Sequence, residues 1–232
     1  MNIISDKEET DLINRYKQLR EKGQHLNSDI INTLSKSAMI ASGKKLGVVK
    51  GKTFQLSNEN ELGIVFDYCL YSHRQGSKNA IERYLKNSPP PEDSDEMLLL
   101  TAMTQSFYSV FSVEQVHEGQ GITVHDIVTD KSFFLVDIGL GNQAMPKLLL
   151  AGRILQLTDF YMSTGAMLPL FTRGLIEEVF SIIEKFLEHK KNQTGNAFFS
   201  PTHEAAFSAQ IIRAALRDGA ISYTRTRPTE NE

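Results

Sequence analysis

One segment of the sequence, residues 117–137, brings together side chain types that could do chemistry. His117 and His125 flank a tight turn at 119–121, so a hairpin would bring the two imidazoles near each other. With Asp126 or Asp137 they would supply the nitrogen and oxygen donors of a metal site, or an acid–base pair for a hydrolase. Against this, His125 and Asp126 are adjacent, and neighbours on a strand point to opposite faces unless a bulge intervenes. These four residues are the catalytic candidates, and the pattern predicts neither a bound metal nor a cofactor.

Other familiar chemical motifs are missing from the sequence. The six histidines include no i,i+4 pair, and the single cysteine, Cys69, excludes a Cys-x-x-Cys metal motif and an internal disulfide. Cys69 lies in an apolar run, 64–70, which favours a buried thiol. No Gly-x-Ser-x-Gly elbow is present. The sequence therefore contains no zinc-binding histidine or cysteine motif and no serine-hydrolase elbow.

The densest basic cluster consists of Lys44, Lys45, Lys50 and Lys52. Such a cluster could contact a phosphate backbone, and this makes nucleic-acid binding one alternative. The other alternative is a solvated hairpin whose charges keep an edge strand from aggregating. The spacing does not match a phosphate-binding loop.

Arg153 is the charged residue inside an apolar strand pattern. On an alternating strand it shares a face with Leu149, Ala151, Leu155 and Leu157. We expect its stem to lie on apolar surface at an edge, or its charge to pair with an acid such as Asp137 or Asp159. Anion binding by Arg153 is the alternative function.

Five β-branched and aromatic runs separated by turn residues predict the centre of the fold. They lie at 110–117, 122–128, 133–138, 148–155 and 160–170. Their pattern predicts a five-stranded antiparallel sheet or a small barrel over about 109–170. Helices with one apolar stripe precede and follow it, so the fold class is α+β, with N- and C-terminal helices packed on a central sheet.

Helix boundaries follow from caps and glycines. Gly23 is expected to end a first helix over 5–22, and a second begins near 27; the glycines of 41–56 argue against a long helix and predict a short hairpin around Lys50 and Gly51. Further helices are expected at 58–74, 80–87, 95–107, 175–187 and 201–216. We interpret 1–222 as a single domain and 223–232 as a flexible polar tail.

Composition limits the class of protein. The chain has 232 residues, 41% of them hydrophobic, and a formal charge of −3, so nucleic acid would need a local patch. The N-terminus lacks a signal-peptide pattern, and no apolar run approaches the ~20 residues of a membrane span. We expect a cytoplasmic protein.

The runs at 118–128, 134–140, 150–155 and 162–166 carry a resemblance. They resemble a group of uncharacterised bacterial proteins and, more loosely, the sheet segment of proteins bearing SEC-C metal-binding tails. The resemblance implies a shared sheet. The SEC-C cysteine and histidine cluster is absent here, so it implies no zinc site.

These observations favour a non-enzymatic interaction or regulatory module of a bacterial cytoplasm. Its partner would be another protein or a second copy, because the apolar stripe at 175–187 can serve a core or a dimer seam. One alternative is a metal-dependent or acid–base hydrolase centred on the sheet histidines and aspartates. The other is a nucleic-acid-associated protein that uses the basic hairpin at 44–52.

Overall fold

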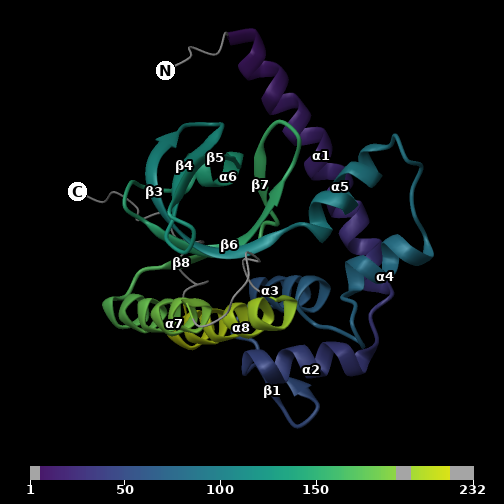
Figure 1. Ribbon diagram of the computed structural model, residues 1–232, viewed down its shortest axis with the longest axis vertical. Coiled ribbons are helices and arrows are strands. Elements are labelled where there is room, and N and C mark those ends of the chain that lie inside the picture. Colours follow the sequence, from purple (N-terminus) through teal and green to yellow (C-terminus); the bar gives the residue numbers. More distant parts are fainter. Residues whose placement is uncertain (1–5, 192–199, 220–232) are drawn as a thin grey trace.

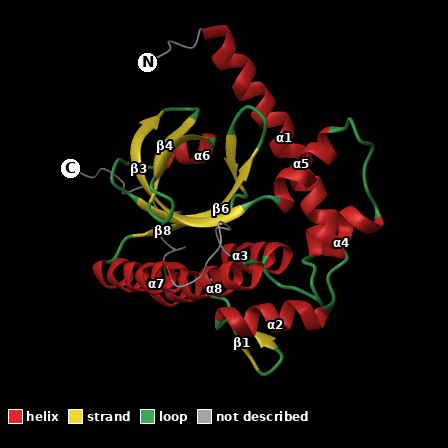
Figure 2. Ribbon diagram, viewed as in Figure 1, coloured by secondary structure: helices red, strands yellow, loops and turns green. Residues whose placement is uncertain are grey.

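The computed structural model describes residues 6–191 and 200–219 and confirms the α+β class. The strands curl into a barrel, with α3, α7 and α8 on one side and α1, α4 and α5 beside it (Figures 1 and 2). The helices are α1 Asp6–Asn32, α2 Lys36–Leu46, α3 Glu59–Tyr71, α4 Ala80–Asn87, α5 Asp95–Thr104, α6 Ile138–Gln143, α7 Arg173–Lys191 and α8 Pro201–Asp218. The strands are β1 Val49–Lys50, β2 Thr53–Phe54, β3 Phe107–His117, β4 Gly121–Asp126, β5 Lys131–Val136, β6 Leu149–Gln156, β7 Tyr161–Ser163 and β8 Leu168–Leu170.

The barrel closes because β3 is long enough to pair on both edges. Its first half pairs with β6 and its second half with β4, so the strand order runs β3-β4-β5-β7-β6 and returns to β3. A register shift between Val113 and Gln115 marks an irregularity that bends β3. With α6 placed between the third and fourth barrel strands, this is the Greek-key connectivity of the oligonucleotide/oligosaccharide-binding (OB) type of barrel.

The prediction of a purely antiparallel sheet was wrong at one pairing. After β5 the chain crosses through α6, returns as β6 beside β3, and then inserts β7 between β5 and β6. The chain of antiparallel pairings through β3 and β4 makes β5 and β6 run in opposite directions. Since β7 lies between them and runs antiparallel to β6, it runs parallel to β5. The predicted last strand, 160–170, divides into β7 and β8, which both pair with β6.

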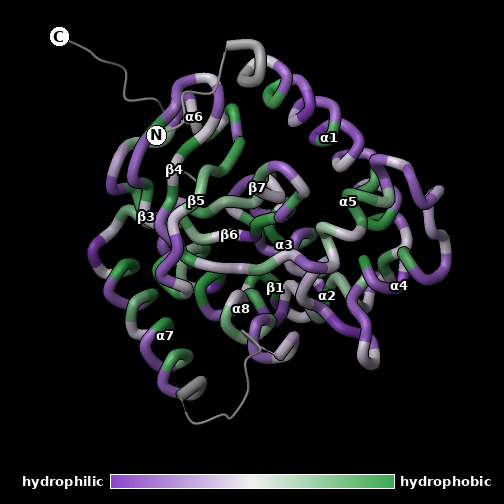
Figure 3. Tube along the Cα trace, turned by 45° about the horizontal axis from the view of Figure 1, so that its top comes forward, coloured by the Kyte–Doolittle hydropathy of each residue, from purple (hydrophilic) through white to green (hydrophobic). Residues whose placement is uncertain are grey.

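Side chains fill the barrel, and the helices cover part of its outer face. Phe111, Ile122 and Leu135 belong to the interior cluster, which α6 closes with Leu140. Outside, Val110 and Ala151 pack with α7 and α8. The hydropathy of α7 alternates along the helix, as expected for one buried stripe (Figure 3). The apolar stripes of α7 and α8 therefore bury the apolar outer face of β3 and β6.

Two predicted helix boundaries were wrong. The first helix continues through Gly23 to Asn32, because Leu26 and Ile30 extend the buried stripe of Leu19. The second continues through Gly43 to Leu46, where a side chain at 43 would collide with Val49 and Phe54 of the hairpin. The hairpin itself, β1–β2, is confirmed. The predicted tail at 223–232 and the end of the predicted domain, 220–222, lie outside the described residues.

The crossing at 139–146 contains α6, which the glycine-rich sequence did not predict. Asp137 caps this helix by accepting a hydrogen bond from the Leu140 backbone N–H at 3.1 Å. Gly141 packs on the β3–β4 turn so closely that a Cβ would lie 2.7 Å from both the Gly121 nitrogen and the His117 carbonyl oxygen. Such contacts are below the distances that real Cβ atoms make, so Gly141 allows α6 to close the barrel end.

We predict that Gly141→Ala lowers the free energy of unfolding by about 2–3 kcal/mol, because backbone atoms of two elements would have to move apart. Urea denaturation measures the change. Gly174→Ala in α7 is the control, since a Cβ there meets nothing within 4 Å and should be neutral or stabilising by up to about 1 kcal/mol. Equal effects of the two substitutions would contradict the packing described for α6.

Candidate functional site

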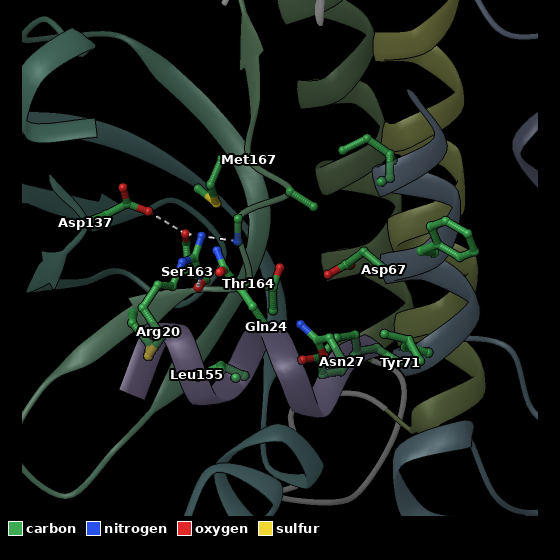
Figure 4. Close-up of a pocket in the computed structure, with 18 of the residues that line it drawn as sticks. Arg20, Gln24, Asn27, Asp67, Tyr71, Asp137, Leu155, Ser163, Thr164 and Met167 are labelled. Carbon is green, nitrogen blue, oxygen red and sulfur yellow. Dashed lines mark hydrogen bonds between the residues drawn. The ribbon is translucent and has the colours of Figure 1, made fainter. Parts of the chain in front are cut away.

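A pocket of about 730 Å³ lies between the barrel, α1 and α3, and we call it the interlayer pocket (Figure 4). The barrel side comes from β6, β7, the segment from 164 to 167 and the start of α6. Its apolar lining includes Leu99, Met103, Leu155 and Met167. Polar side chains interrupt this lining: Arg20, Gln24, Asn27, Asn60, Asp67, Tyr71, Asp137, Gln143, Ser163 and Thr164.

Ser163 anchors the barrel side of the pocket. Its hydroxyl donates to Asp137 Oδ2 at 2.6 Å and accepts from the Gly165 backbone N–H at 3.1 Å. Its carbonyl oxygen accepts from Arg20 Nη1 of α1 at 2.6 Å. Gly165 has a positive φ of 94°, and a Cβ there would lie 2.4 Å from Arg20 Nη2. A glycine at 165 therefore lets the Arg20 guanidinium lie against the chain after β7.

The guanidinium of Arg153 is a buried cation next to the pocket residue Asp67. Arg153 projects from the outer face of β6 and is only 2% exposed. Its guanidinium forms an ion pair with Glu204 of α8 at 2.6 Å and donates to Ser72 and Ser106 at 3.2 Å. It also lies over the Tyr71 ring, 4.9 Å from the centroid. Arg153 thus joins the barrel to α3 and α8.

The predicted face of Arg153 is confirmed, and its predicted partners were wrong. Ala151 and Leu155 pack on the same outer side of the barrel. The ion-pair partner is Glu204 rather than Asp137 or Asp159, because α8, far away in sequence, covers this part of β6. A carboxylate from a distant helix cannot be identified from the local pattern.

Asp67 is the acidic group of the pocket wall. It lies on α3 next to the Arg153 cluster and points into the pocket (Figure 4). Burial raises the pKa of the Asp67 carboxyl, and the charge of Glu204 adds to this rise. Arg153 and Thr164 act in the opposite direction but do not cancel the effect of burial.

Two uncharged polar oxygens on the pocket lining accept no hydrogen bond from any described residue. Asn27 Oδ1 and Thr164 Oγ1 are buried and make no hydrogen bond of ordinary geometry with any described residue. The Thr164 hydroxyl nonetheless interacts with the Asp67 carboxyl and lowers its pKa, so the capacity that remains free on Thr164 is that of its oxygen to accept. Buried polar atoms without partners cost about 1–3 kcal/mol each, so each of these two atoms would gain from a hydrogen-bond donor placed in the pocket.

The charges behind and within the pocket do not balance. Arg153 contributes one positive charge, and Glu204 and Asp67 contribute two negative charges when both are ionised. The close ion pair uses Glu204, at 2.6 Å. An ionised Asp67 is therefore left as the excess negative charge of this cluster. Burial is the main cause of the raised pKa of Asp67, and the charge of Glu204 adds to it.

The structure does not bring the four predicted catalytic residues together. His117 pairs across from Gly121 and His125 across from Ser112, so four residues of β4, about 13 Å, separate them. Asp126 is buried on the other face from His125 and accepts from Ser109 and the Val128 backbone N–H. Within 6–191 and 200–219, no group of three or more His, Cys, Asp or Glu side chains has the arrangement of a metal site.

Asp137 is the one predicted catalytic residue that lines the interlayer pocket. Its oxygens accept from Ser163 and from the α6 backbone, so the carboxylate is occupied as a helix cap. His117 instead donates to or accepts from Thr123 at 2.9 Å and packs on the Phe134 ring. His125 lies on the outer face of β4, where it contacts Ser132 and Asp130.

The predicted basic cluster lies away from the pocket, at the end of α2 and on the β1–β2 hairpin (Figure 1). All four lysines are exposed, and Phe54, the aromatic residue nearby, packs toward Gly43. Cys69 is buried, as predicted, and burial raises the pKa of its thiol.

Four residues of the pocket were not predicted from the sequence: Arg20, Asn27, Asp67 and Thr164. A usable signal existed for Asp67, which is the charged residue in the apolar run 64–70. Arg153 gave the same signal on a strand, and the two lie in one cluster. Nothing local marks Asn27, Thr164 or Arg20, because their surroundings come from other elements.

The chain belongs to a family of unknown function, DUF7986, whose model matches residues 10–200. No curated protein and no solved structure matches the chain. The match contains every element that lines the interlayer pocket, and nothing in it links the chain to SEC-C proteins. Among the described residues, no helix combines the length and apolar character that crossing a membrane requires.

We predict that Arg153→Leu lowers the free energy of unfolding by about 3–5 kcal/mol, because it leaves the Glu204 and Asp67 carboxylates without their cation. Denaturant unfolding measures the loss. Arg173→Leu is the matched control: Arg173 pairs with Glu177 on the surface at 93% side-chain exposure and should contribute less than about 0.5 kcal/mol. A loss below 1 kcal/mol for Arg153→Leu would contradict a stabilising role of the buried pair.

The raised pKa of Asp67 predicts a specific pH dependence. The folded protein binds the Asp67 proton more tightly than the unfolded chain, so this group lowers stability as pH rises from the ordinary aspartate pKa, 3.8, through the raised value. Above that window the loss is complete. We expect Asp67→Asn to be more stable than the parent at neutral pH and to lack this decline.

Unfolding measured at several pH values tests this. Asp29→Asn, an exposed carboxyl on α1, is the control and should keep the parent profile. Destabilisation by Asp67→Asn at neutral pH would show that the Asp67 carboxylate is well paired in the fold, contrary to the description above.

Proposed function

We propose that this DUF7986 protein is a non-enzymatic regulatory module that binds a small organic molecule in the interlayer pocket. The observation that carries the proposal is the pocket itself, whose volume of about 730 Å³ lies in the range of ligand sites. It has apolar walls and a few convergent polar groups, which is the usual composition of such sites.

The polar groups of the pocket support binding rather than structural packing. Asn27 Oδ1 and the Thr164 hydroxyl oxygen accept no hydrogen bond from any described residue, and Asp67 carries an unfavourable charge when it is ionised. A ligand that donates hydrogen bonds would satisfy them. Sites of this kind reduce stability in the free protein and regain it on binding.

The position of α1 gives binding a route to regulation. This helix packs on α3, α4 and α5, and it contacts the barrel through the Arg20 hydrogen bond to Ser163 and the Tyr16–Phe160 ring contact. A molecule in the pocket would touch both α1 and the barrel. Binding would therefore stabilise the packing of α1 on the barrel, and a protein that binds α1 would have a different affinity for the free and the ligand-bound states.

Thermal-shift measurements with a broad metabolite library test the proposal. We expect at least one compound to raise the melting temperature, since a ligand at 100 times its Kd stabilises a protein by about 2.7 kcal/mol. Gly63→Trp should abolish the shift, because residue 63 lines the pocket and a Cβ there meets open space.

Gly174→Trp is the matched control. It places the same side chain on α7, also in open space and outside the pocket lining, and should leave the shift unchanged. The proposal fails if no compound in the library binds, or if the compounds that bind do so equally well to Gly63→Trp.

A further inference from the structure

We propose that the ligand of the interlayer pocket is a small zwitterionic amino compound of amino-acid or short-peptide type, with its ammonium at Asp67 and its carboxylate at Arg20. This inference rests on the proposed function and specifies its ligand. Figure 4 shows the two charged residues on opposite sides of the pocket, with Thr164 between them.

The inner end of the pocket selects a cation. The close ion pair of Arg153 is with Glu204, at 2.6 Å, which leaves Asp67 as the excess negative charge of the cluster. An ammonium group beside Asp67 would restore the neutrality of this cluster. Charge-assisted hydrogen bonds to carboxylates are the strong ones in such surroundings.

Three oxygens around the pocket can accept hydrogen bonds from that ammonium. An ammonium carries three N–H donors and no acceptor. Asp67, Asn27 Oδ1 and the Thr164 hydroxyl oxygen supply three acceptors from three different elements around the same pocket. A ligand carboxylate or phosphate at this end would meet acceptors and a negative charge, and would be repelled.

The other end of the pocket selects an anion. Arg20 forms no ion pair with any described residue, and its hydrogen bond to the Ser163 carbonyl uses one of the five N–H donors of a guanidinium. The neighbouring carboxylate, Asp137, is already bound by Ser163 and the α6 backbone. The remaining donors of Arg20 match a carboxylate.

Apolar side chains also line the pocket. Leu99, Met103, Leu155 and Met167 line it, so a hydrocarbon side chain would be buried there. The volume exceeds that needed by the smallest amino acids and accommodates a larger amino acid or a dipeptide. A polyol or a multiply charged phosphate ester would leave these side chains without a matching surface.

The test is a thermal-shift and calorimetric comparison of the proteinogenic amino acids and a set of apolar dipeptides, each as the free zwitterion, the N-acetyl derivative and the C-terminal amide. We expect free zwitterions among the ligands, and 10- to 100-fold weaker binding after either end is blocked. N-acetyl derivatives that bind as tightly as free compounds would overturn the assignment of the ammonium, and amides that do so would overturn the assignment of the carboxylate.

Two variants connect each end of the ligand to its residue. Asp67→Asn should weaken the zwitterion 10- to 100-fold and leave the N-acetyl derivative unaffected, although the variant itself is expected to be the more stable protein. Arg20→Gln, which keeps a donor for the Ser163 carbonyl, should weaken the zwitterion and leave the amide unaffected. Equal loss for blocked and free ligands in either variant would show a merely structural role.

The same experiments separate this inference from the proposed function. If neutral or anionic metabolites bind and are excluded by Gly63→Trp while every free amine in the set fails, the inference is wrong and the proposed function stands. If no metabolite and no amine binds, both are wrong.

Discussion

The burial of one positive charge, on Arg153, sets the relation between the barrel and the helices. A guanidinium on the outer face of a barrel strand cannot be taken out of water without a carboxylate and hydrogen-bond acceptors, because its desolvation costs several kcal/mol. Glu204 supplies the carboxylate from α8, and Ser72, just after α3, supplies an acceptor. The second nearby acid, Asp67, then becomes the charge that is left over. The ion pair between Arg153 and Glu204 thus joins α8 to the barrel and also leaves Asp67 as the negative charge of the interlayer pocket.

The barrel provides the rigid side of this arrangement. Its interior is filled by side chains, so the ligand space lies outside it, against α1 and α3. In OB-type barrels the usual ligand surface is the outer face of the second and third strands. Here those strands are β4 and β5, and the interlayer pocket instead lies beside β6 and β7. Connectivity alone would therefore have pointed to a different surface, and the site has to be identified from its own side chains.

Local patterns in the sequence were sufficient for the strands, and failed where distant segments meet. Alternating apolar residues and the 119–121 turn predict β3 and β4. The same alternation in β6 places Arg153 on the outer face of the barrel, together with Ala151. The parallel pairing of β5 with β7 depends on the path through α6, which no local signal describes. Gly23 was expected to end a helix, but tertiary packing of Leu26 and Ile30 outweighs its low helix propensity. The pocket was missed for the same reason, because Asn27, Asp67 and Thr164 belong to three separate segments.

The most direct measurement is the titration of the Asp67 carboxyl carbon by NMR in the ligand-free protein, with Asp67→Asn used to assign the resonance. The account predicts a pKa above the ordinary aspartate value of 3.8, because burial outweighs the attraction of Arg153 once Glu204 has taken the close ion pair. A pKa at or below 3.8 would mean that Arg153 fully compensates Asp67. The pocket would then have no excess negative charge, and the account would be contradicted.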